Sequence, residues 1–167
     1  MKHMLTGALL TGLLVAGGCE EPYKTTDKLT QVTISGKPFT LELAMDQASR
    51  VQGLSGRKEI PDSGGMLFVF PDSEVRVQEF VMRDCPIPID IIFLDRSRRV
   101  TGSHAMLVEE PRRESEDMQT YENRLKRYSS RFDAQFAIEL KGGTLEKLAI
   151  KPGEQINIDP ALASKAK

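Results

Sequence analysis

The sequence predicts an α+β, β-rich domain: a mixed, mostly antiparallel sheet curled into a pseudo-barrel, with two or three short helices. Three observations predict this class. Short segments either alternate apolar and polar residues or are wholly apolar, and Gly and Pro turns separate them. Seven or eight such segments outnumber the helical patterns. Most lie close enough along the chain to pair as hairpins.

The predicted strands rest on period-two alternation and on apolar runs. In chain order they are residues 31–35, 39–43, 66–70, 78–82, 87–94, 100–104, 134–140 and 154–158. The first two form a hairpin, because the turn-forming Gly36-Lys37-Pro38 separates them. The wholly apolar run at 66–70 is typical of a strand buried on both faces.

Two or three short helices are predicted between the strands. Asp46 is a favourable N-cap for a helix over residues 47–52, which Gly53 ends. A short helix follows Gly142, up to Leu148. Another lies within residues 118–128, where apolar residues recur at spacings of three and four, so one face would dock on the body. Its members are Met118, Tyr121, Leu125 and Tyr128.

The N-terminus predicts export rather than a membrane span. After the basic start Met1-Lys2-His3, residues 4–18 carry no charge. This run of about 15 residues is shorter than the roughly 20 of a transmembrane helix and fits a secretory signal. The small residues directly before Cys19 resemble a bacterial lipobox, with Ala16 where Leu is usual. The resemblance implies cleavage before Cys19 and lipidation of its thiol; an ordinary signal peptide or an uncut anchor is the alternative.

The predicted organisation is a signal peptide at 1–18, a polar tether at 19–29, one globular domain at 30–159 and a flexible tail at 160–167. With 167 residues, 40% hydrophobic and 28% charged, the chain is long enough for one domain. A net charge of −1 argues against a nucleic-acid partner, which needs a basic surface. Two cysteines, one of them assigned to lipid, cannot make a disulfide framework.

An ordered set of motifs resembles the bacterial and archaeal family called domain of unknown function 192. The motifs are Arg50-Val-Gln-Gly-Leu54 with Arg57, Pro61 with Gly65-Met-Leu-Phe-Val-Phe-Pro71, Phe80-Val-Met-Arg-Asp-Cys85 with Ile87-Pro-Ile-Asp90, Tyr128-Ser-Ser, 134–140 and 143–153. The resemblance spans about 32–158 and implies a β-rich pseudo-barrel with no established activity. The chain departs from the pattern at four positions: Val81 stands in place of Trp, Arg83 in place of Lys, Asp84 in place of Asn and Cys85 in place of Thr. The segment 109–127 is also longer than is usual in the family.

The charged and soft side chains within these motifs are the candidate binding residues. Arg50 and Arg57 either clamp an anion or bridge loops through carbonyl groups. Asp90 lies in an apolar run, so it is expected to pair with an Arg, to cap backbone N–H groups, or to serve as a ligand or general base. The candidate binding set is Arg50, Arg57, Met82, Arg83, Asp90 and His104.

No catalytic residue, metal ligand or cofactor is assigned from the sequence. Cys85, His104 and Asp90 would supply a thiol, a base and an acid if the fold brought them together. Cys85 is expected to be free, shielded and not catalytic, because Asp84 disfavours its thiolate. His104 and the soft atoms of Met66, Met82, Met106 and Cys85 lack the spacing of a metal motif.

The leading expectation is an exported, membrane-tethered accessory or binding domain, not an enzyme, that recognises a small polar or anionic group or a partner protein. It would be held outside the cytoplasm, on the cell membrane or the outer membrane, by lipidated Cys19. The membrane, a small polar ligand or an envelope protein are then its partners. One alternative is an envelope hydrolase or transferase acting through Asp90, His104 or Cys85. Another is an interaction module that works through the charged segment 109–131.

Overall fold

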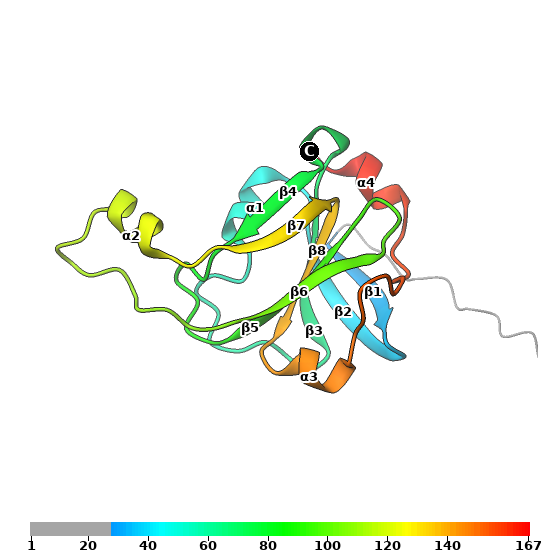
Figure 1. The fold of residues 1–167 in the computed structure, drawn as a ribbon, viewed down its shortest axis with the longest axis horizontal. Helices are drawn as coiled ribbons and strands as arrows, with labels where there is room; N and C mark the ends of the chain where they lie inside the picture. The colour runs from blue at the N-terminus through cyan, green and yellow to red at the C-terminus, as the bar shows by residue number, and fades with distance from the viewer. Residues whose placement is uncertain (1–27) are drawn as a thin grey trace, which may run out of the picture.

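A six-stranded mixed sheet forms the body of the computed structural model, which describes residues 28–167 (Figure 1). Its strand order is β1 (Leu29–Ile34), β2 (Lys37–Ala44), β3 (Gly64–Val69), β8 (Phe136–Lys141), β5 (Ile89–Leu94) and β6 (Val100–Met106). A second, two-stranded sheet consists of β4 (Arg76–Phe80) and β7 (Tyr128–Ala134), and β7 runs beside β6. The expected signal peptide, lipidated Cys19 and most of the tether lie outside the described residues.

Residues 28–167 also contain four short helices, two between strands and two after β8, so the β-rich α+β class is confirmed. They are α1 (Gln47–Gln52), α2 (Met118–Arg124), α3 (Thr144–Leu148) and α4 (Ala161–Lys165). A 3-10 turn at Asp72–Glu74 precedes β4. The six-stranded sheet does not close into a barrel, because β1 and β6 form its two edges. Within residues 28–167, no helix has the length and apolar character to cross a membrane.

The β1–β2 hairpin turns one residue earlier than its sequence suggests. Ser35 and Gly36 both have positive φ, 46° and 76°, as a tight hairpin turn requires. Lys37 and Pro38 therefore belong to β2, where Pro38 lies opposite Thr33. β2 and β3 are the one parallel pair of the six-stranded sheet, and the crossover that parallel strands need contains α1.

The two faces of the sheet bury separate cores, because successive residues of a strand point to opposite sides. On β5, Ile92 and Leu94 join a core that α3 and α4 cover, with Leu148 and Leu162 among its members. The neighbouring residues Ile89, Ile91 and Phe93 face the other core, toward Phe80, Tyr128 and the loop after α1. This second face carries the pocket described below.

Three segments differ from their sequence-based prediction. Residues 128–134 form β7, because Tyr128 is buried against β4 and β6 rather than ending the helix around 118–128. The expected strand at 154–158 is reduced to one bridge, Arg99 to Gln155. The expected flexible tail at 160–167 contains α4, whose Leu162 is only 1% exposed and packs into the first core.

The charged segment 109–131 is anchored rather than detached. Its α2 lies at one end of the molecule (Figure 1). Tyr121 of α2 is buried, and so are Leu125 after the helix and Tyr128 of β7. Met118 is 52% exposed and does not join that face. The backbone N–H of Asp84 donates to the Tyr121 hydroxyl at 3.1 Å, which ties the segment to the loop after β4.

Candidate functional site

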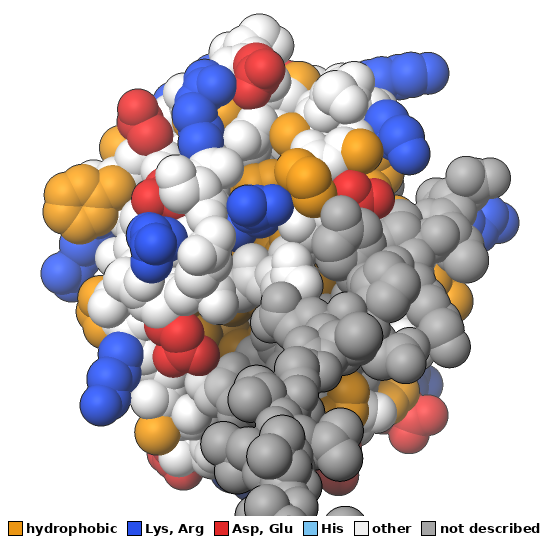
Figure 2. Space-filling view, turned by 90° about the vertical axis from the view of Figure 1, so that its right-hand side faces the viewer, with side chains coloured by type: hydrophobic (Ala, Val, Ile, Leu, Met, Phe, Trp, Pro, Cys, Tyr) orange, Lys and Arg blue, Asp and Glu red, His pale blue; other side chains and the backbone are white. Residues whose placement is uncertain are grey.

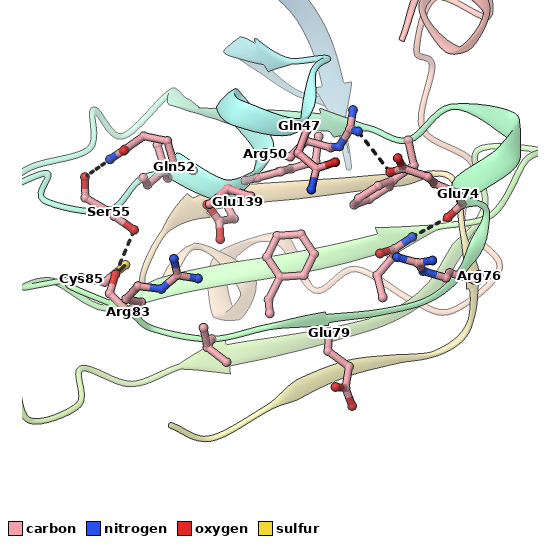
Figure 3. Close-up of a pocket in the computed structure, with 18 residues that line it drawn as sticks. Gln47, Arg50, Gln52, Ser55, Glu74, Arg76, Glu79, Arg83, Cys85 and Glu139 are labelled. Carbon is pink, nitrogen blue, oxygen red and sulfur yellow. Dashed lines mark hydrogen bonds and ion pairs between the residues drawn. The ribbon is translucent and has the colours of Figure 1, made fainter. Parts of the chain in front are cut away.

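An open pocket of about 270 Å³ lies between α1 with its following loop, β3, β8 and β4 (Figure 3). Its wall combines phenyl rings with charged and polar groups. The residues that line it are Gln47, Arg50, Val51, Gln52, Gly53, Leu54, Ser55, Phe68, Phe70, Glu74, Arg76, Gln78, Glu79, Phe80, Val81, Arg83, Cys85 and Glu139. On a second face of the molecule, basic and acidic side chains are interspersed (Figure 2).

Glu139 supplies the most unusual group of this pocket. It sits in the middle of β8, paired with Met66 of β3 and Ile91 of β5, and is 5% exposed. Its Oε2 is buried with no hydrogen-bond partner. Burial raises the pKa of the Glu139 carboxyl to about 8, while a hydrogen bond from the Leu54 backbone N–H acts against that rise. At neutral pH the carboxyl therefore holds its proton and is a hydrogen-bond donor.

The end of α1 brings backbone close to this carboxyl. Asp46 caps the helix by accepting from the Ser49 N–H at 2.9 Å, as its sequence position predicts. Gly53 ends it with φ of 51°, a conformation that side chains disfavour. A Cβ at Gly53 would lie 3.3 Å from the Phe68 ring and 3.7 Å from Glu139 Oε2. Glycine here lets the helix end pack closely over the pocket floor.

Arg83 reaches the pocket from the loop after β4. Its Nε lies 2.6 Å from Glu122 Oε1 of α2, so the charged segment orients this guanidinium. In Figure 3 the Arg83 guanidinium and the Glu139 carboxyl point into the same end of the pocket, near Ser55 and Cys85. The Ser55 hydroxyl donates to the Arg83 carbonyl at 2.9 Å, which holds this loop against the α1 loop.

Arg50 is more fully engaged by the protein than Arg83. Its side chain is 8% exposed and ion-pairs with Glu74 at 3.1 Å. It also donates to the Val69 carbonyl at 3.2 Å and to the Lys167 carbonyl at 2.9 Å. The predicted role of bridging loops therefore describes Arg50, although one edge of it borders the pocket.

Cys85 is free and buried, in agreement with its expected state. Its Sγ donates to the Arg83 carbonyl at 3.4 Å. Burial, reinforced by the nearby Glu139, raises the pKa of the Cys85 thiol to about 11. A thiol with such a pKa is a poor nucleophile at neutral pH.

Three of the predicted binding residues lie outside the pocket. Arg57 forms an ion pair with Glu42 of β2, with Nη2 to Oε2 at 2.6 Å. Met82 is 1% exposed and packs in the second core. Asp90 is 1% exposed and accepts from the Leu145 N–H at 2.7 Å, at the start of α3.

The expected ion pair between Asp90 and an arginine is therefore wrong. Strand alternation turns Asp90 to the face of Ile92 and Leu94, away from the pocket arginines. Backbone N–H groups of α3 replace the arginine, and burial raises the pKa of the Asp90 carboxyl while those hydrogen bonds lower it. This matches the alternative that Asp90 caps backbone N–H groups, although the capped groups were expected near Cys85-Pro86 and are those of α3.

His104 lies on β6 opposite Ile91, on the face that Asp90 does not share. Its Nε2 donates to the Ser129 carbonyl at 2.8 Å, and its ring lies 6.0 Å from Phe93 and 5.8 Å from Tyr128. Cys85, His104 and Asp90 therefore do not form one constellation. Among residues 28–167, no group of three or more His, Cys, Asp or Glu side chains is arranged to hold a metal ion.

The sequence reasoning found Arg50 and Arg83 of this pocket but missed Glu139, Arg76 and the phenyl rings. One signal for Glu139 was present. The segment Phe136-Ala-Ile-Glu-Leu140 is otherwise apolar, so a carboxyl in it must be either buried or at a sheet edge. The position of β8 between β3 and β5 shows that Glu139 is buried rather than at a sheet edge.

Comparisons with known proteins agree with the fold. The model of the family domain of unknown function 192, described as "Uncharacterized ACR", matches residues 30–158. A search of curated proteins finds no match. A solved structure from Sinorhizobium meliloti 1021, provisionally named a transcription regulator, is similar at 24% identity and a TM-score of 0.62, covering 78% of this chain and 92% of that chain. A protein of unknown function from Novosphingobium aromaticivorans DSM 12444 is similar at 27% identity and a TM-score of 0.60, covering 78% and 84%.

Proposed function

We propose a function from the pocket itself, because this chain belongs to the domain of unknown function 192 family, which is described only as uncharacterized. The chain is a binding domain that takes a small polar molecule into the pocket between α1 and β4. Lipidated Cys19 holds it to a membrane outside the cytoplasm, and the polar residues between Cys19 and β1 are the tether. Catalysis is not part of this proposal.

The observation that carries the binding function is the unpartnered Oε2 of Glu139. Buried polar atoms are nearly always hydrogen-bonded, and leaving one unpaired costs about 1–3 kcal/mol. Here the residue that carries the atom lines an open pocket rather than a sealed core. A ligand with a complementary polar group would satisfy it, and the rings of Phe68 and Phe80 would contact the ligand's apolar part.

A tryptophan at Val81 tests the pocket. Val81 lines the pocket, and Trp is the residue usual there in the family that the sequence resembles, so the substitution keeps the fold and fills the space. Ligand-observed NMR with a set of small polar fragments should give hits on the full-length chain that Val81→Trp loses. Val77→Trp is the matched control, because Val77 lies on β4, is 45% exposed and is outside the pocket. Hits that survive Val81→Trp, or no hits at all, would contradict the binding function.

Membrane attachment is tested separately through Cys19. The wild-type chain should sediment with membranes and carry a lipid-modified N-terminal Cys19 by mass spectrometry. Cys19→Ala should be released or remain unprocessed, because the thiol that accepts the lipid is gone. An unmodified mature N-terminus together with unchanged membrane retention would refute the anchor and leave the pocket assay unaffected.

A further inference from the structure

Two groups at one end of the pocket have hydrogen-bonding capacity that the described chain does not use. Glu139 Oε2 is buried and has no partner. Arg83 is held through its Nε by Glu122, and its two terminal nitrogens have no hydrogen bond or ion pair within residues 28–167. Both side chains point into the same space (Figure 3).

The charge around this space favours an anionic group over a cationic one. Arg83 contributes a fork of donors at this end, whereas Arg76 lies at the other end of the pocket, beside Glu74 (Figure 3). Glu74 is already paired with Arg50, and Glu79 is half exposed, 3.9 Å from Arg127. An ammonium group at this end of the pocket would therefore face the Arg83 guanidinium.

We propose that the pocket binds a small organic carboxylate whose oxygens accept from the terminal nitrogens of Arg83 and from the carboxyl group of Glu139. This inference rests on the proposed binding function and names its ligand class. The planar fork of an arginine matches the two oxygens of a carboxylate. A protonated carboxyl beside it adds a further donor without adding charge.

The apolar part of this ligand lies against phenyl rings. Phe80 packs edge-on against Phe68 at 5.0 Å between ring centroids, and both rings line the pocket. The pocket volume of about 270 Å³ is near the lower end of the roughly 300–1,000 Å³ usual for ligand pockets. A single ring or a short alkyl chain is therefore the size of body that this site accepts.

The proton on Glu139 makes carboxylate binding sensitive to pH. Because the pKa of Glu139 is about 8, about a tenth of it remains protonated at pH 9, and affinity should fall about tenfold from its value at pH 6.5. Charged or titratable groups that face Glu139 from the pocket wall are Arg50, Glu74, Arg76, Glu79, Arg83 and Cys85. Glu42 and His104 lie on the same face of the sheet, in the cross-strand row of Glu139.

Titration calorimetry on the full-length chain, with three probes of matched shape, tests the ligand class. The probes are phenylacetate, phenylacetamide and phenethylamine, which place an anion, a neutral amide and a cation on the same ring. Phenylacetate should bind most tightly at pH 6.5 and weaken about tenfold by pH 9. Glu139→Gln should bind phenylacetate with no such loss, because its amide still donates while every other titratable group is retained.

Arginine variants locate the carboxylate. Arg83→Met should weaken phenylacetate binding at least tenfold and leave phenylacetamide unchanged. Arg83→Lys, which keeps the charge but not the fork, should give an intermediate loss and serves if Arg83→Met fails to fold. Arg57→Met is the matched control, because Arg57 lies outside the pocket and is ion-paired with Glu42.

The outcomes separate this inference from the function on which it rests. Tightest binding of phenethylamine, or phenylacetate binding that Arg83→Met leaves intact, would overturn the carboxylate and leave the pocket as a binding site. If none of the three probes binds while Val81→Trp still removes fragment hits, the carboxylate is likewise overturned and the pocket remains a binding site. Failure of the probes together with an absence of fragment hits would overturn both.

Discussion

Replacing Glu139 by glutamine should change how the stability of the chain depends on pH. The Glu139 carboxyl is buried, and its pKa rises from 4.5 to about 8 on folding. The folded state therefore keeps a proton that the unfolded state loses between those two values. Because the unfolded state binds fewer protons in this window, the free energy of unfolding falls as pH rises from 4.5 to 8 and then levels off.

The size of this effect follows from the two pKa values. A tenfold difference in proton affinity between the folded and unfolded states corresponds to about 1.4 kcal/mol. The free energy of unfolding should therefore fall by roughly 3–4 kcal/mol between pH 5 and pH 8 through Glu139 alone. Glu139→Gln has the same shape and no titration, so its stability relative to the wild type should rise by that amount over this range.

Urea unfolding at half-unit intervals from pH 5 to pH 9 measures the difference between the two chains. Subtraction removes all the groups they share, including carboxylates such as Glu42, whose pKa is lowered and whose contribution has the opposite sign. Glu79→Gln is the control, because it makes the same chemical change at a half-exposed position. Parallel curves for the wild type and Glu139→Gln would refute the buried, protonated carboxyl.

Three further predictions follow from the described contacts. Asp90→Ala should lower the free energy of unfolding by about 1–3 kcal/mol, because the Leu145 N–H loses its acceptor. Asp90→Asn should lower it by less, because its amide oxygen can still accept. Equal urea midpoints for the wild type and both variants would contradict this role. Cys85, with a pKa of about 11, should react with iodoacetamide at pH 7.5 at least about 100-fold more slowly than a cysteine peptide. Unfolding in urea should remove this protection. Labelling of the folded chain at the peptide's rate would show an accessible thiolate instead. Arg57→Ala should cost no more than about 1 kcal/mol in thermal unfolding, because its ion pair with Glu42 is solvent-exposed, whereas a larger loss would mean a structural role.

Local sequence signals determined much of the fold. The strand and helix classes, the Asp46 cap and the Gly53 end of α1 depend on neighbours within a few residues, so the pattern alone predicted them. β7 was missed because Tyr128 recurs at helical spacing with Leu125, although β4, far away in the sequence, holds it as a strand. Leu162 was likewise predicted to lie in a flexible tail, because only the assembled first core shows that it is buried.

The site shows the same division. Arg50 and Arg83 were identifiable from their motifs, whereas Arg57 and Asp90 belong to the same motifs and lie elsewhere. Residue type indicates what a side chain can bind, but the strand position decides which face of the sheet it reaches, and a shift of one residue reverses that face. The sequence by itself determined most of the strands and helices, the family and the available chemistry. Tertiary structure alone decided that Glu139 is buried between β3 and β5 and shares a pocket with Arg83, because burial and proximity arise from segments far apart along the chain.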